Sequence, residues 1–142
     1  MKRNRFLIAC LVGLTPLSLQ AEDAQDLNCD DAYTTRDINR CMGIELKQAE
    51  ALLEQYLKTS FTRYTEDESI RLSIRTAQQR WQKYRETQCA SVYETWRTGS
   101  IRNTMYLNCS IRLTKQRTWD VWMDYLTYAD SSEPVLPEPA RD

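Results

Sequence analysis

The chain has 142 residues, with 19 Lys and Arg against 20 Asp and Glu, and it contains no histidine. This length suits one domain of ordinary size. Without histidine, Ser-His-Asp and Cys-His catalysts and mixed Cys/His zinc sites are excluded. We therefore expect no enzyme, no metal site and no cofactor.

The first 21 residues have the pattern of a cleaved secretory signal. Basic residues precede an apolar run, Phe6–Leu19, that is too short to span a bilayer. Cleavage after Ala21 leaves 142 − 21 = 121 residues with a charge of 16 − 20 = −4. A competing interpretation is a lipoprotein box ending at Cys10, which the very short apolar run before that cysteine disfavours. We expect a periplasmic or secreted protein without a further membrane span.

Between Glu22 and Glu133 the chain has no proline and only two glycines, which predicts helix throughout. A first helix is expected over about 36–63, capped by Thr34 or Thr35 and with Asp37 in its first turn.

A second helix is expected to begin in Thr65-Glu66-Asp67-Glu68, where Thr65 and Glu68 match the capping box. Apolar residues then recur at helical spacing and predict the face that lies against the core. These residues are Ile70, Ile74, Ala77, Trp81 and Tyr84.

Gly99 and its neighbours interrupt the helical pattern, and a third helix is expected over about 103–128. Residues 130–142 are acidic and proline-rich, which predicts a disordered tail. Three helices joined by tight turns predict an all-α fold, an antiparallel three-helix bundle spanning residues 22–129.

Four cysteines remain after signal cleavage, and they indicate two structural disulfides. Cys41 lies about 22 residues before the first predicted turn and Cys89 about 22 residues after it, which places both at one level of the bundle. Cys109 falls at the same level, and Cys29 can reach it. Three pairings are open; we favour Cys29–Cys41 and Cys89–Cys109 because each closes a short loop.

These residues carry a family resemblance. Ala77-Gln78-x-x-Trp81-x-x-Tyr84-Arg85-Glu86-x-x-Cys89, followed by Gly99-Ser100 and by Cys109-x4-Thr114-x-x-Arg117, resembles the lysozyme inhibitor LprI-like family of exported bacterial proteins. The resemblance covers roughly residues 29–120. It departs from the family pattern at Leu52-Leu53-Glu54-Gln55-Tyr56 and at Thr98-Gly99-Ser100. It implies a helical binding protein that inhibits a muramidase.

Two further sets of residues have both a functional and a structural interpretation. Trp81, Tyr84 and Arg85 resemble an interface hot spot, but their place on the apolar stripe favours core packing, with Arg85 bonded to a carboxylate or a helix end. Thr114 and Arg117 similarly favour an internal polar tie between helices.

Two exposed segments are candidates for partner binding. The acidic turn Glu66-Asp67-Glu68 could enter a basic cleft, although helix N-termini attract such charges anyway. The loop at Gly99 and Ser100 is the second candidate.

The mature chain is mildly acidic, which disfavours nucleic acid and favours a basic protein partner such as a lysozyme-type muramidase. We therefore expect steric and electrostatic occlusion of that enzyme. Two alternatives are an envelope structural or stress interaction module without an enzyme target, and an immunity protein against a cell-wall-degrading toxin.

Overall fold

The computed structural model of the protein describes residues 27–141, so the predicted signal and its cleavage site lie outside the described residues. A short 3-10 helix, η1 (Cys29–Asp31), precedes three long helices, α1 (Thr35–Arg63), α2 (Glu68–Thr95) and α3 (Arg102–Tyr125). The part of the chain that the structure describes contains no strand. The predicted all-α fold with three helices is confirmed.

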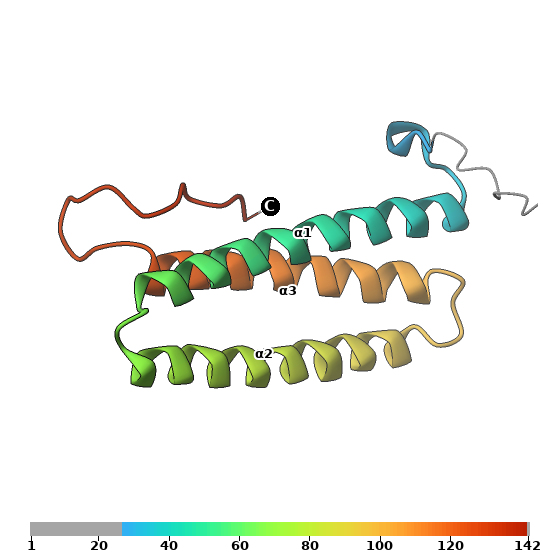
Figure 1. Cartoon of the computed structure of the whole chain (residues 1–142). Coiled ribbons are helices and arrows are strands. Elements are labelled where there is room, and N and C mark those ends of the chain that lie inside the picture. The colour runs from blue at the N-terminus through green and yellow to red at the C-terminus, as the bar shows by residue number, and fades with distance from the viewer. Residues whose placement is uncertain (1–26, 142) are drawn as a thin grey trace, which may run out of the picture.

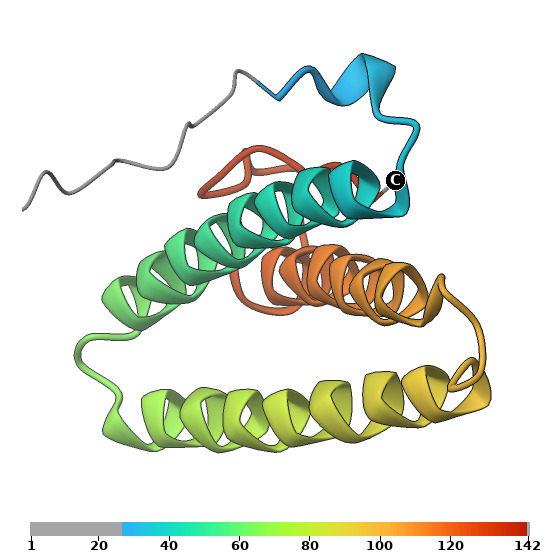
Figure 2. The same ribbon diagram turned by 90° about the vertical axis from the view of Figure 1, so that its right-hand side faces the viewer.

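The three helices run up, down and up, as Figure 1 shows. α3 packs against both α1 and α2, and its packing against α1 is the more extensive. α1 and α2 make few direct contacts with each other, and Figure 2 shows them spread apart on either side of α3. The bundle is therefore open between α1 and α2.

The helix N-termini are set by side-chain caps. Thr34 Oγ1 accepts a hydrogen bond of 3.1 Å from the backbone N–H of Asp37, which confirms the predicted start of α1. The capping box predicted at Thr65 is wrong. Asp67 caps α2 by accepting from Ile70 N at 2.9 Å, whereas Thr65 donates back to the carbonyl of Thr62. A carboxylate two residues later is in place to satisfy the free amides, so the helix begins there.

The core lies in two clusters along α3. The first joins α1 to α3, and the second joins α2 to α3 around a disulfide. The partly buried indole of Trp81 packs against both clusters. The first cluster consists of Leu53, Tyr56, Val121, Trp122 and Leu126, and the second of Cys89, Cys109 and Leu113.

The predicted apolar stripe of α2 is only partly buried. Ile74 is fully buried, but Tyr84 is 53% exposed, so its assignment to the core is wrong. The reason is that α2 contacts mainly α3, and a helix with one neighbour buries a narrower stripe than a helix between two neighbours.

Both favoured disulfides are present. Cys29 is bonded to Cys41, and Cys89 is bonded to Cys109. Cys41 lies near the start of α1, Cys89 near the end of α2 and Cys109 near the start of α3, and these three helix ends meet at one end of the bundle (Figure 1). The predicted cross-linking of a single end is therefore confirmed.

The expectation of a disordered tail is corrected. Residues beyond α3 turn back and follow the face of α1 and α3 that lies away from α2 (Figures 1 and 2). The N–H of Val135 donates to the carbonyl of Leu126 at 2.8 Å, and the indole N–H of Trp122 donates to the carbonyl of Leu136 at 2.8 Å. Composition alone indicated disorder, but aromatic donors on the bundle hold this segment in place.

Candidate functional site

The opening between α1 and α2 forms a groove, which we call the α1–α2 groove. It has a volume of about 350 Å³ and a lining in which apolar side chains alternate with charged and amide ones. A second hollow of about 480 Å³ continues it toward the α1–α2 turn, sharing Glu54 and Leu57 with it. The α1–α2 groove is lined by Glu50, Leu53, Glu54, Leu57, Gln78, Trp81, Gln82 and Arg85.

Arg85 connects all three helices beside this groove. Its Nη1 lies 2.9 Å from Glu50 Oε1 on α1 and donates to Thr114 Oγ1 on α3 at 2.8 Å. Its guanidinium lies 5.2 Å from the ring centroid of Trp81 on its own helix. The predicted bond of Arg85 to a carboxylate is confirmed, and the carboxylate is Glu50.

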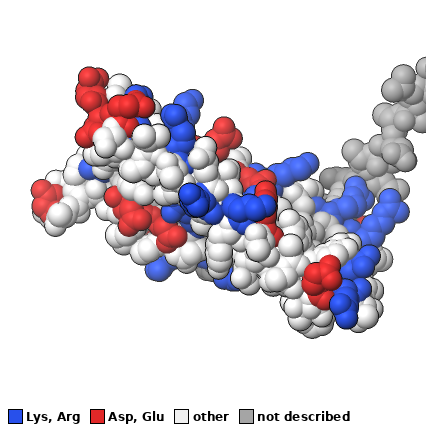
Figure 3. Space-filling model, turned by 90° about the horizontal axis from the view of Figure 1, so that it is seen from below, with Lys and Arg blue, Asp and Glu red and all other residues white. Residues whose placement is uncertain are grey.

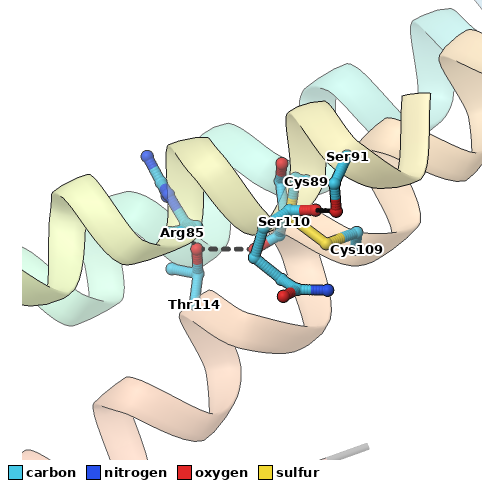
Figure 4. The surroundings of a disulfide bond; sticks show 7 residues. Arg85, Cys89, Ser91, Cys109, Ser110 and Thr114 are labelled. Atoms are coloured by element: carbon cyan, nitrogen blue, oxygen red, sulfur yellow. Dashed lines mark hydrogen bonds between the residues drawn. A yellow bond between two sulfur atoms is a disulfide. The ribbon is translucent and has the colours of Figure 1, made fainter. Parts of the chain in front are cut away.

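The acceptor for Arg85 is oriented by a further hydrogen bond. Thr114 is fully buried, and its hydroxyl donates to the carbonyl of Ser110 at 2.7 Å, which leaves the oxygen lone pairs for Arg85. Figure 4 shows Arg85 and Thr114 near the Cys89–Cys109 disulfide. The disulfide and the arginine therefore hold α2 to α3 at adjacent turns.

Arg117 makes a second tie between α2 and α3. It is only 9% exposed, and its Nε donates to Gln78 Oε1 at 3.1 Å, while its Nη2 is buried without a hydrogen-bond partner. Arg117 and Thr114 therefore form polar ties between helices, as predicted. They are not bonded to each other: Thr114 is bonded to Arg85 and Arg117 to Gln78, both on α2. Tyr84, which also carries the resemblance, takes no part in these ties and is exposed on α2.

The acidic turn lies at the opposite end from the disulfides. Glu66, Asp67 and Glu68 are all exposed. Asp67 is committed to the helix cap and Glu68 pairs with Arg71, so two of the three carboxylates already have structural roles. Glu66 is the member best placed for an outside partner.

The Gly99 loop has a different chemistry. Ser100 is exposed, and the N–H of Gly99 donates to the carbonyl of Trp96 at 2.8 Å. Trp96 is 39% exposed and Ile101 is 40% exposed on either side of the loop. This end therefore presents apolar surface together with basic residues and differs in kind from the acidic turn.

Charge is separated along the molecule. Residues 27–141 contain 20 − 4 = 16 acidic and 19 − 3 = 16 basic residues, because Glu22, Asp23, Asp26 and Asp142 and three bases lie outside that range. Residues 27–141 thus have no net charge. On the face seen in Figure 3, acidic side chains gather toward the end with the α1–α2 turn and basic ones toward the other end. Within residues 27–141, any attraction to a basic partner must come from this separation.

Within residues 27–141, no group of three His, Cys, Asp or Glu is placed to hold a metal ion. The same residues include no helix that is long and apolar enough to cross a membrane. Sequence analysis missed Glu50, since only its distance from Arg85 in space distinguishes it from other acidic residues on α1.

The fold and the site define a small helical protein with two disulfides. The family described as lysozyme inhibitor LprI matches residues 28–120, which include both disulfides, Arg85 and Arg117. The chain belongs to this family. No curated protein and no solved structure matches it.

Proposed function

We propose that this protein is an exported inhibitor that binds a lysozyme-type muramidase and blocks its substrate cleft. The single observation that carries the proposal is membership of the lysozyme inhibitor LprI family, which matches residues 28–120. Two disulfides support export, because such bonds persist in oxidising compartments.

The acidic end is the proposed contact with the enzyme. A basic cleft attracts exposed carboxylates, and complementary charge speeds the encounter of two proteins. The exposed Glu66 and Glu68 stand at a narrow turn, which can enter a cleft. Because disulfides restrain the other end of the bundle, little conformational entropy is lost on binding.

The test is inhibition of cell-wall lysis by c-type and g-type lysozymes, using the mature oxidised protein. We expect inhibition at micromolar concentration. Absence of inhibition of either enzyme would contradict the proposal and favour one of the alternatives, an envelope interaction module or an immunity protein.

The contact surface is tested by two charge reversals of equal size. Glu66→Lys with Glu68→Lys leaves the Asp67 cap intact and should raise the concentration for half inhibition about tenfold. Glu86→Lys with Glu94→Lys makes the same change in charge on exposed positions of α2, nearer the disulfide end. This control should inhibit like the natural protein. Equal effects of both pairs would show that only net charge matters and that the acidic turn is not the contact.

A further inference from the structure

Three aromatic side chains form a surface on the face of α1 and α3 away from α2. They are Tyr56, Trp119 and Trp122, here called the aromatic surface, and each donates a hydrogen bond to the C-terminal segment. Tyr56 Oη donates to the carbonyl of Pro137 at 2.7 Å, and Trp122 Nε1 donates to the carbonyl of Leu136 at 2.8 Å. Trp119 Nε1 donates to Glu138 Oε1 at 3.0 Å.

The segment on this surface has the composition of a proline-rich ligand. It reads Pro134-Val-Leu-Pro-Glu-Pro139, and Pro139 is buried while Leu136 packs against the α1–α3 core cluster. Proline lacks an N–H and has a fixed φ, so such a segment leaves its carbonyls free to accept and loses little entropy when bound. Aromatic grooves elsewhere recognise proline-rich peptides by this combination of ring contact and donation to carbonyls.

Side-chain contacts at the end of the segment add selectivity. The guanidinium of Arg141 lies 4.7 Å from the ring centroid of Trp119 and 4.0 Å from the Glu138 carboxylate. Glu138 accepts a hydrogen bond from the indole of Trp119, so the aromatic surface directly contacts a carboxylate that follows the second proline.

The segment is held to the bundle by few backbone contacts. An open hollow of about 540 Å³ is lined by residues 133–138 and by Trp122. The connection from α3 runs through exposed residues 128–133, where the backbone N–H of Ser132 donates to Asp130 Oδ1 at 2.9 Å. Only one backbone N–H of residues 134–139, that of Val135, bonds to the bundle. The whole segment also lies beyond the part of the chain that the family matches.

We propose that the aromatic surface is a binding site for proline-rich peptides, occupied in the resting protein by the chain's own segment 134–139. The partner is a proline-rich segment of another protein with an aliphatic residue before one proline and a carboxylate after it. Because a short connection gives the resident segment an effective concentration of about millimolar, an outside peptide must displace it. This site is separate from the acidic turn and does not depend on muramidase inhibition.

The experiment uses a fluorescent peptide of residues 133–141 and the full mature chain, with fluorescence anisotropy as the readout. In one variant, Pro134, Pro137 and Pro139 are all replaced by Gly, which raises the entropy cost of seating the resident segment and leaves the aromatic surface intact. We expect the peptide to bind this variant at least about tenfold more tightly than the natural chain. A peptide with the same three replacements should not bind.

Two further variants locate the binding. Adding Tyr56→Phe and Trp122→Phe to the glycine variant removes two donors while an aromatic ring remains at each position, and should weaken peptide binding about tenfold or more. Trp96→Phe, at the far end of the bundle, should leave it unchanged. Circular dichroism checks that each variant is folded. The proposal is overturned if the folded glycine variant does not bind the peptide, binds it no better than the natural chain, or binds it equally without the two donors.

Discussion

Removing the Cys89–Cys109 disulfide is expected to lower the free energy of unfolding by about 3 kcal/mol. The bond joins residues separated by 20 positions, and the entropy of closing a loop of that size in the unfolded chain is worth about that amount. Both cysteines are buried and pack with Leu113 between α2 and α3. The folded protein therefore keeps the two positions together without the bond, and the whole entropy gain of the unfolded chain appears as lost stability.

Removing the Cys29–Cys41 disulfide should cost less than about 1 kcal/mol, although its separation of 12 residues predicts a similar loop entropy. The η1 segment packs mainly against α1, and Cys29 is exposed. Without the bond, this segment gains freedom in the folded protein as well as in the unfolded chain, so the two gains largely cancel.

The two cysteine pairs are replaced by alanine separately, and unfolding in urea is followed by far-UV circular dichroism. The difference between the two losses is the informative quantity, because each variant serves as the control for the other. Equal losses, or a larger loss from the Cys29–Cys41 pair, would refute the reasoning from native-state packing.

Three further predictions concern single side chains, each measured by urea unfolding. Asp67→Ala should lower the free energy of unfolding by about 1 kcal/mol because it removes the cap of α2, and Thr65→Ala should lower it by less than about 0.5 kcal/mol. A larger loss from Thr65→Ala than from Asp67→Ala would support the capping box at Thr65 instead. Arg85→Lys should cost about 1 kcal/mol, because an ammonium cannot reproduce the planar bridge from α1 to α3, and unchanged stability would show that the bridge contributes little. Burial raises the pKa of Tyr56 above 10.0, so the unfolded chain ionises first and stability should fall as the pH rises above that value. Tyr56→Phe should lack this fall between about pH 9 and about pH 11, and a fall of equal size in both proteins would contradict the assignment to Tyr56.

The separation of charge along the molecule changes the argument for a basic partner, which the net charge of the mature chain had favoured. The predicted acidity of the mature chain comes from Glu22, Asp23, Asp26 and Asp142, all outside residues 27–141, and residues 27–141 carry no net charge. Within residues 27–141, partner selection by charge therefore depends on the two ends of the bundle. The acidic turn would attract a basic partner, and the basic end at the Gly99 loop would attract an acidic one.

Much of the scaffold could be predicted because it depends on neighbours in the sequence. The absence of proline and the scarcity of glycine predicted the helices, Thr34 predicted the start of α1, and the loop lengths favoured the disulfide pairs that are present. The resemblance at Trp81, Arg85 and Arg117 predicted the family. The start of α2 was harder to predict, because Thr65 and Asp67 can both cap a helix and only Asp67 does so.

Sequence alone thus determined the helical segments, the cross-linked end and the family, because helix spacing, caps and short loops act over a few residues. Only the tertiary structure decided that α3 lies between α1 and α2, which opens the α1–α2 groove and leaves Tyr84 exposed. It also decided that the tail is held on the bundle. Tyr56 and Pro137 are 81 residues apart, and their hydrogen bond depends on packing that brings distant surfaces together and leaves no local pattern in the chain.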